Sequence, residues 1–474
     1  MKTIYHISKI KILIASFALL FFTACSEDYP KNVESSNEVI LKSIKILNAG
    51  ADGKTSLQGI IDENTKTVSF PRIAPETDFS NIRFEVELSN NAKMDKESYS
   101  FPFAAGESSK TIVVKVVNEP RFREYFVTLR LNVPVFGADF NKPQIYDYTN
   151  NELGNPVYPD FTGLATRGSS FDGEYVLVVT RTKTGSHLLK VEDLKNNKIN
   201  PILLNLTGVS GGTFPVNCGA KIKGHTYIAN LAGKFGLKIY HWADPAAAPE
   251  IILNVDAANI PGAGVRYGDN MSANIDEKGN GYIFFGDNAA TGVLRFKVTN
   301  FTTIDDPKIL PTVKGVTSFM SFNKVDKTED FIFTGYEAPI MVANADAKIA
   351  FTLDAAAVPL KGADARIVTF NKERYLIMAT AARSGSDVVV LYVYDITKGN
   401  TTVEALTLFN QKADKKPIYE YSLLGPTNTA PSTQTGWYIE KDASGNDDKL
   451  MLYAASADAG FVIIELPKKK LEEE

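Results

Sequence analysis

From residue 173 to the C-terminus, apolar and polar positions repeat as one unit about every fifty residues: a polar turn, a short apolar run, a loop of small residues and a second apolar run. Six segments match one another, namely GEYVLVV, GHTYIAN, GNGYIFF, EDFIFTG, ERYLIMA and DKLMLYA. Their equivalent positions are spaced by 52, 55, 49, 44 and 75 residues, and are Tyr175, Tyr227, Tyr282, Phe331, Tyr375 and Leu450. Strand-forming repeats of this length are typical of β-propeller blades, which cover one another's apolar faces. We therefore predict a six-bladed β-propeller.

The first repeat is long enough to show the strands of one blade. Its apolar runs predict four strands, at 164–171, 174–180, 188–192 and 202–206. The turns between them contain Asp-Gly and Asn-Asn pairs, which accept the positive φ angles of tight hairpins. The sixth repeat has no fourth run, because the chain ends shortly after the strand predicted at 461–466. Since an exposed strand edge needs a partner, we predict that residues 135–148 add the missing strand and close a propeller spanning 134–467.

A different pattern precedes the propeller. Between residues 38 and 133, apolar and polar positions alternate in short runs, most clearly at 82–88, 112–116 and 125–131. This period of two predicts a small antiparallel β-sandwich, so the whole chain is expected to be all-β. The module resembles the immunoglobulin-like, cadherin-like domain of Bacteroidetes surface lipoproteins in three places, VSFP at 68–71 and the runs at 77–82 and 123–129. The resemblance implies that this module is a spacer.

The first 24 residues are predicted to be a lipoprotein signal peptide. Lys2, Lys9 and Lys11 form a positive region, and an apolar stretch of about eleven residues follows at 12–22. Such a stretch is too short to cross a bilayer as a helix but is typical of a signal peptide. The sequence FTAC that ends at Cys25 resembles a bacterial lipobox, with Phe where Leu is usual. The resemblance implies lipidation of Cys25 and anchoring to a membrane, and an ordinary secretory signal with a nearby Cys is the alternative.

Residues 25–37 are polar and predict a tether between the lipid anchor and the sandwich. The tether begins with Cys25 followed by Ser-Glu-Asp at 26–28, which resembles the surface-export signal of Bacteroidetes lipoproteins. The resemblance implies an outer-membrane protein that faces the cell exterior. A solvated linker on a periplasmic lipoprotein is the alternative. Residues 468–474 are expected to form a charged, solvated tail.

Composition excludes several kinds of partner and site. The net charge of −4 and the lack of a basic stripe argue against nucleic acid as a partner. Once Cys25 is lipidated, only Cys218 remains, so no intramolecular disulfide can form. The motifs His-Glu-x-x-His, Cys-x-x-Cys and Gly-x-Ser-x-Gly are absent, so we predict no metal, no cofactor and no patterned catalytic site. A glycoside hydrolase or lyase that uses unpatterned carboxylates stays open as an alternative.

Candidate ligand-binding residues cluster in the loops expected at one end of the propeller. Loops between the second and third strands of a blade share that end with the loops that enter the next inner strand. An aromatic ring can stack on the C–H face of a sugar, while Arg and Asp can bind its vicinal hydroxyls. For Arg266 and Asp269 a structural ion pair is the alternative, and for Trp437 it is packing within an inner strand. The predicted ligand-binding residues are Arg266, Tyr267, Asp269, Tyr336, Arg366, Arg383 and Trp437.

The order of lipobox, acidic triplet, sandwich and propeller resembles the surface glycan-binding lipoproteins of Bacteroidetes polysaccharide-utilisation systems. The resemblance implies a non-catalytic protein that holds a polysaccharide or oligosaccharide beside an outer-membrane transporter complex. Two other functions stay open at this point. One is a propeller glycoside hydrolase or polysaccharide lyase, and the other is a protein–protein scaffold.

Overall fold

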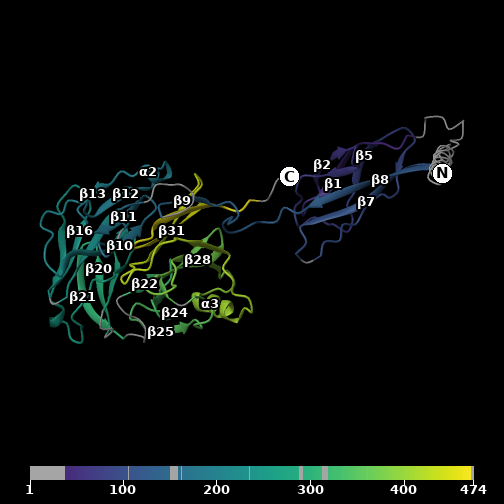
Figure 1. Ribbon diagram of the computed structural model, residues 1–474. Helices are drawn as coiled ribbons and strands as arrows, with labels where there is room; N and C mark the ends of the chain where they lie inside the picture. Colours follow the sequence, from purple (N-terminus) through teal and green to yellow (C-terminus); the bar gives the residue numbers. More distant parts are fainter. Residues whose placement is uncertain are drawn as a thin grey trace, which may run out of the picture. The chain divides into compact units, whose positions relative to one another are not determined.

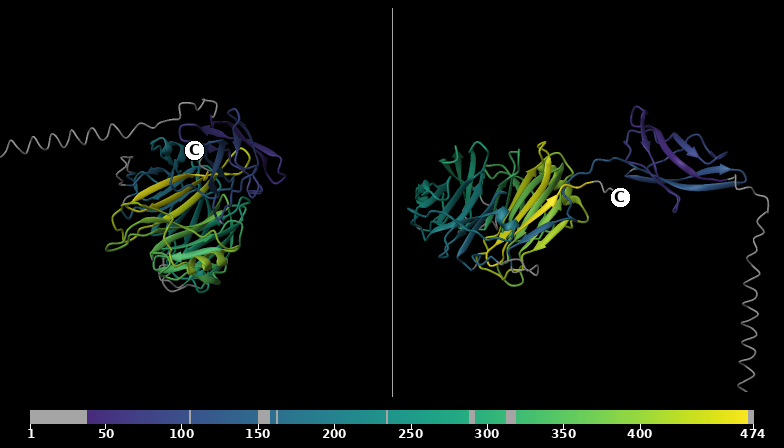
Figure 2. Two further views of the ribbon diagram at one scale, coloured as in Figure 1. Left: turned by 90° about the vertical axis from the view of Figure 1, so that its right-hand side faces the viewer. Right: turned by 90° about the horizontal axis from the view of Figure 1, so that it is seen from above.

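The computed structural model describes residues 38–470, apart from 105, 150–157, 162, 234, 288–291, 312–318 and 360. The expected signal peptide, the lipidation site Cys25, the tether and the last four residues of the predicted tail lie outside the described residues. The chain is all-β and divides into two compact units, Met1–Pro134 and Val135–Glu474 (Figure 1, Figure 2). In the part of the chain that the structure describes, no helix is long and apolar enough to span a membrane.

The first unit is the predicted sandwich of two small sheets. One sheet has the order β2-β1-β5, with β1 (Leu41–Ala49), β2 (Thr55–Gln58) and β5 (Phe84–Leu88). The other has the order β3-β4-β8-β7-β6, with β3 (Ile60–Asp62), β4 (Thr67–Ser69), β6 (Lys93–Met94), β7 (Ser109–Asn118) and β8 (Arg121–Arg130). Alternate side chains of both sheets, such as Ile44, Val114 and Tyr125, meet in one core. The period-two pattern is therefore confirmed as an inside–outside alternation.

The second unit is the predicted six-bladed propeller, built from six four-stranded antiparallel sheets. Blades one to three contain β10 (Thr166–Phe171), β11 (Tyr175–Thr180), β12 (His187–Lys190) and β13 (Ile202–Leu203); β14 (Phe214–Ile222), β15 (His225–Leu231), β16 (Leu237–Trp242) and β17 (Glu250–Val255); and β18 (Ser272–Ile275), β19 (Gly281–Gly286), β20 (Val293–Thr299) and β21 (Thr303–Leu310). Blades four to six contain β22 (Met320–Lys324), β23 (Phe331–Gly335), β24 (Ala338–Ala343) and β25 (Ile349–Thr352); β26 (Gly362–Phe370), β27 (Glu373–Thr380), β28 (Val390–Asp395) and β29 (Tyr419–Ser422); and β30 (Gln434–Lys441), β31 (Asp447–Ser456), β32 (Gly460–Pro467) and β9 (Gln144–Asp147).

The repeat in the sequence is explained by packing between blades. Side chains of blades one and two, including Leu177 and Ile228, form one apolar cluster. Phe284 of blade three and Phe322 of blade four meet at a ring-centroid distance of 4.2 Å in another. Each blade therefore covers the apolar face of its neighbour, which a single four-stranded sheet cannot do for itself.

The ring is closed by a strand from the start of the second unit. β9 pairs antiparallel with β32, so that Ile145 lies opposite Ile464. The ring of Tyr148, which is fully buried, stacks on Phe461 at a centroid distance of 5.0 Å. The fourth strand of the sixth blade thus comes from the 135–148 segment.

Two short helices interrupt the expected strand pattern. The prediction that the third strand of blade one extends to residue 192 is wrong, because α2 (Val191–Lys195) begins there and buries Val191 and Leu194 on one side. Helix α3 (Thr402–Gln411) lies in the long step before the sixth repeat, and the Thr401 hydroxyl caps its N-terminus by accepting a hydrogen bond from the Glu404 amide. A 3-10 turn, η1 (Ala257–Asn259), lies between blades two and three. The region at 410–435 therefore contains the end of α3 and β29 as well as a loop.

Replacing Tyr148 by Ala should lower the free energy of unfolding by about 3–5 kcal/mol, because it removes a buried aromatic side chain from the strand segment that closes the ring. Denaturant unfolding of the full chain measures this change. The matched control is Phe136→Ala in the same segment, where the ring is exposed and the loss should stay within about 1 kcal/mol. Equal losses for the two variants would contradict a closing role for the buried ring.

Candidate functional site

The inner strands of the six blades surround a central cavity of about 1050 Å³. Its lining includes the turns that follow these strands, at 172–174, 223–224, 276–280 and 326–327. We call the end of the propeller with these turns the turn end, and the opposite end, with the loops between second and third strands, the loop end. The cavity opens at the turn end, whereas the sequence analysis placed the ligand-binding residues at the loop end.

Much of the polar lining connects neighbouring blades. Asn274 of blade three donates to the carbonyl of Phe322 at 2.8 Å and accepts from the amide of Lys324 at 2.7 Å, both in blade four. Ser272 accepts from the Phe322 amide at 3.0 Å. Equivalent bonds join the later blades, from the amides of Ala365, Thr435 and Ser169 to the side chains of Ser321, Asp364 and Gln434. These side chains form an inter-blade collar, and their polarity alone is not evidence for a ligand.

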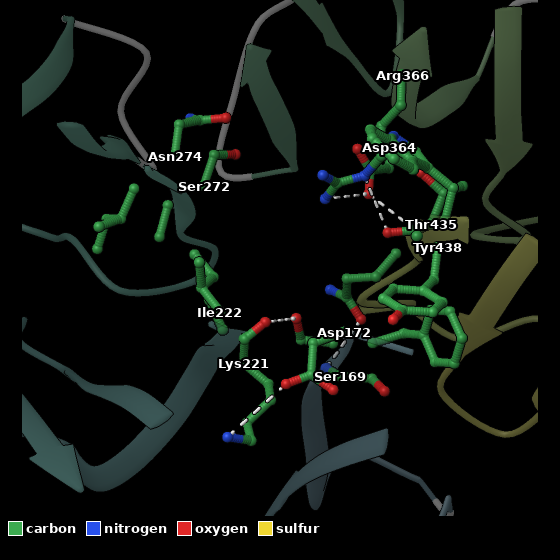
Figure 3. Close-up of a pocket in the computed structure, with 18 of the residues that line it drawn as sticks. Ser169, Asp172, Lys221, Ile222, Ser272, Asn274, Asp364, Arg366, Thr435 and Tyr438 are labelled. Carbon is green, nitrogen blue, oxygen red and sulfur yellow. Dashed lines mark hydrogen bonds and ion pairs between the residues drawn. The ribbon is translucent and has the colours of Figure 1, made fainter. Parts of the chain in front are cut away.

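Arg366 is held at the wall of the cavity by blade six (Figure 3). Its Nε donates to the carbonyl of Thr435 at 3.0 Å, and its Nη2 lies 3.6 Å from the carboxylate of Asp364. Asp364 is buried and also accepts from the Thr435 amide at 2.7 Å. The Arg366 side chain keeps 31% of its surface exposed. It therefore presents a fixed positive charge with unused donor capacity to the cavity.

A second charged pair lies on the wall of blades one and two, where Lys221 Nζ is 3.7 Å from the carboxylate of Asp172 (Figure 3). The Lys221 side chain is almost entirely buried. Burial lowers the pKa of Lys221 from its ordinary value, and the neighbouring Asp172 acts in the opposite direction. This pair ties the first inner-strand turn to blade two and leaves little free charge.

An exposed aromatic ring lies at the mouth of the cavity. Tyr438 in β30 is 41% exposed, and its ring packs against Gly173 of blade one. Gly173 has φ +94°, and a Cβ at that position would lie 2.1 Å from the Tyr438 ring, so only Gly fits there. The preceding Trp437 is partly buried against the core of blades five and six and also lines the cavity. Tyr282 of blade three lines it too, with Arg295 packed 4.7 Å from its ring centroid.

At the loop end of the channel, described side chains from several blades contact one another. The buried Arg167 of blade one donates to the carbonyl of Ala430 at 2.9 Å, and its Nη2 lies 3.6 Å from Asp269 of the loop that enters blade three. Ala430 packs in turn against a small apolar cluster that contains Phe319 and Tyr336. Of these residues, Asp269 and Phe319 line the cavity.

The seven predicted ligand-binding residues separate into two groups. Asp269, Arg366 and Trp437 line the cavity, and Arg266 forms an ion pair with Asp269 at 2.9 Å. The remaining three lie at the loop end.

Two predicted roles at the loop end need correction, those of Tyr267 and Tyr336. Tyr267 is fully buried, and its hydroxyl accepts from the Gly264 amide at 2.9 Å, while burial raises its pKa to about 12. Tyr336 is also buried, and its hydroxyl donates to Asp387 at 2.6 Å. Arg383 lies 5.4 Å from the Tyr336 ring centroid but is exposed, so its ligand-binding role stays a prediction. Neither tyrosine is available for stacking on a ligand, because both rings are already covered by protein.

The sequence analysis missed Tyr438 and its support by Gly173. The Asp-Gly pair at 172–173 was identified as a turn, but nothing in the local sequence shows that an aromatic ring from the last blade covers it. The pairing of two histidines is likewise visible only in the structure. In the structure, His225 Nδ1 and His241 Nε2 are hydrogen-bonded at 2.7 Å, and the His225 ring stacks on Phe301 at 4.0 Å.

No metal site is found among the described residues, since none of them forms a group of three or more His, Cys, Asp or Glu side chains. Cys218 is buried, and burial raises the pKa of its thiol, which disfavours the nucleophilic thiolate.

Comparisons with known proteins place the chain in a family. The model of a family described as "Domain of unknown function (DUF4623)" matches residues 27–469. The chain belongs to this family. A crystal structure of a DUF4623 family protein from Bacteroides eggerthii is 42% identical, covering 91% of this chain and 99% of that one, with a TM-score of 0.83. Among curated proteins, none matches the chain.

Two other solved structures are much less similar to this chain. A subtype N11 neuraminidase-like protein from a flat-faced bat isolate is 11% identical, with coverage of 72% and 97% and a TM-score of 0.42. The WD40 β-propeller domain of Doa1 is 8% identical, with coverage of 79% and 97% and a TM-score of 0.34.

The His225–His241 pair predicts a pH-dependent stability. Burial lowers the pKa of both imidazoles, that of His241 from 6.5 to about 4, with a further contribution from His225. The unfolded chain therefore binds more protons than the folded one in this window, so stability should fall as the pH falls from about 6.5 towards about 4. The loss between pH 7 and pH 5, measured by denaturant unfolding, should be smaller in His241→Asn than in the parent protein. Parallel pH profiles of the two proteins would contradict this assignment.

Proposed function

We propose that this protein is a non-catalytic surface lipoprotein that binds a polysaccharide or oligosaccharide in the central cavity of its propeller. One observation carries the proposal: the half-exposed Tyr438 ring lies at the cavity mouth, beside a wall that holds Arg366 in a fixed position. An aromatic face covers the C–H face of a sugar ring, and a guanidinium binds adjacent hydroxyls or a carboxylate. The structure thus supplies both kinds of contact in one cavity.

The size and lining of the cavity favour a ligand of several sugar units. Its volume of about 1050 Å³ lies at the upper end of the roughly 300–1,000 Å³ that small-molecule sites usually have. Trp437 and Tyr438 come from blade six, and Tyr282 comes from blade three, three blades further around the ring. Aromatic rings on different blades can support different units of one chain.

Two buried carboxylates of the cavity, those of Asp364 and Asp269, already have protein partners. The carboxylate of Asp364 accepts hydrogen bonds from the Thr435 amide and the Asn323 side chain, and it forms an ion pair with Arg366. Asp269 is paired with Arg266 and lies near Arg167. A glycosidase needs one carboxyl group free to donate a proton and a second free to attack or to activate water. These two carboxylates are used instead to hold blades together.

The membrane anchor is the second part of the proposal, and it rests on the sequence. Lipid attached to Cys25, followed by the acidic triplet at 26–28, would hold the protein on the outer face of the outer membrane. The tether and the sandwich would then separate the propeller from the membrane. A bound glycan would be available there to an outer-membrane transporter complex.

Replacing Tyr438 by Ala should weaken glycan binding about tenfold while leaving the melting temperature unchanged, because the ring is exposed and contributes little to the core. Gly173→Ala should weaken binding as well, since the added methyl group displaces the same ring. A polysaccharide array identifies the bound glycan, and calorimetric titration then measures the dissociation constants.

The matched control is Phe122→Ala, which removes an exposed ring from the sandwich. Loss of stability without loss of affinity in Tyr438→Ala would contradict the proposed site, and release of shorter fragments from the glycan would support a hydrolase or lyase.

Replacing Cys25 by Ala should release the protein from membranes into the soluble fraction, because the acyl chains can no longer be attached. In intact cells carrying the parent protein, added protease should digest the propeller. Both results are read by immunoblotting of cell fractions. Protection of the parent protein until the outer membrane is opened would place it on the periplasmic side instead.

A further inference from the structure

The cavity has a floor at the loop end, formed by the segment that precedes β30. The side chain of Asn428 in this segment donates to the carbonyl of Gly163 at 3.1 Å, and its backbone N–H donates to the carbonyl of Ala382 at 2.9 Å. The segment is therefore attached both near blade one and at blade five. With Arg167 bonded to Ala430 and lying 3.6 Å from Asp269, the described residues near blades one, three, five and six are connected across this end of the channel. A ligand that enters at the turn end meets these residues.

Several polar atoms at the floor are buried and have no hydrogen-bond partner among the described residues. They come from blades one and six and from the loop that enters blade three, and three of the four residues line the cavity. Buried polar atoms are nearly always satisfied in native proteins, so a group of them beside a cavity is a place where a polar molecule, either water or a ligand, can bind. The four atoms are Arg167 Nε, Asn270 Oδ1, Ser432 Oγ and Thr435 Oγ1.

Ser432 has a strained backbone in addition to its unpaired hydroxyl. Its φ angle is +44°, in the left-handed region that Ser rarely adopts. Strained residues of this kind persist where the surrounding structure fixes them, and they are frequent at ligand sites. The neighbouring Thr433 has neither feature, because its hydroxyl is bonded to Ser456 at 3.0 Å.

We propose that the cavity recognises the end of a glycan chain rather than an internal segment. The inference rests on the function proposed above. The terminal sugar lies on the floor, where rotation of the Ser432 and Thr435 side chains about their Cα–Cβ bonds brings the buried hydroxyls to its hydroxyl groups, together with Asn270. The following units pass Arg366 and leave the cavity beside Tyr438. An internal segment would have to enter and leave through the same mouth, because the contacts of Arg167 and Asn428 cross the channel at the floor.

Calorimetric titration of the full-length protein tests this with short and long maltose-, cellulose-, xylan- and polygalacturonate-derived oligosaccharides and with their parent polysaccharides. For a series that binds, the expected stoichiometry is one protein per chain at every length. A number of bound proteins that rises with chain length would overturn the inference and leave the proposed function in place. Absence of binding throughout the panel would overturn both.

Variants of the floor provide a second test that separates binding from folding. Thr435→Val and Ser432→Gly should weaken binding of the oligosaccharide identified above about three- to tenfold, by removing a hydrogen-bonding group. Both should keep or raise the melting temperature. In Thr435→Val a methyl group replaces a buried hydroxyl that has no partner, and in Ser432→Gly the left-handed strain is relieved.

The matched control is Thr433→Val, which also changes a cavity-lining residue but breaks the bond to Ser456. It should lower the melting temperature and leave the affinity within about twofold. Unchanged affinity in both Thr435→Val and Ser432→Gly would overturn the assignment of the floor as the site of the terminal sugar.

Discussion

The blades of this propeller are joined at the axis by side chains, since among the described residues no backbone ladder runs from one inner strand to the next. Asn274 shows how this works: its amide group donates to one backbone carbonyl of the next blade and accepts from one backbone amide, as a neighbouring strand would. Asp364 and Gln434 supply similar bonds to the amides of Thr435 and Ser169. An amide or carboxylate near the axis is therefore required by the fold, and the central channel is polar for that reason before any ligand is considered.

This requirement decides which residues can be assigned to a ligand. Polar side chains whose atoms are all engaged between blades are explained by the fold. The remaining groups at the cavity are not explained in this way. They are an exposed aromatic ring that packs on a glycine, a guanidinium that is held in place but has unused donors, and hydroxyls that have no hydrogen-bond partner. Tyr438 and Arg366 lie on the walls, and Ser432 and Thr435 lie at the floor. The proposed function depends on these residues, because the packing of the blades does not account for them.

The two ends of the propeller differ in the contacts that the described residues make across the channel. At the loop end, Arg167 and the segment around Asn428 bridge several blades, and the rings of Tyr267 and Tyr336 are buried. At the turn end, short hairpin turns leave the channel open. A cavity with one mouth and a polar floor favours a ligand that enters lengthwise, and the aromatic rings at the mouth favour a ligand with apolar faces. A glycan chain has both properties.

The sequence by itself determined the all-β class, the sandwich and the six blades. Alternation and repeat length are properties of the local sequence, and every blade must have them in order to pack against its neighbours. It also indicated that the final blade lacked a strand, which β9 supplies in the structure. The helix α2 was missed, since Val191 and Leu194 belong to a run too short to show a helical period. Only the tertiary structure decided which end of the channel is open and which polar residues are engaged. Those outcomes depend on contacts such as Gly173 with Tyr438 and Arg167 with Ala430, between residues on blades that are far apart in the chain and adjacent only when the ring is closed.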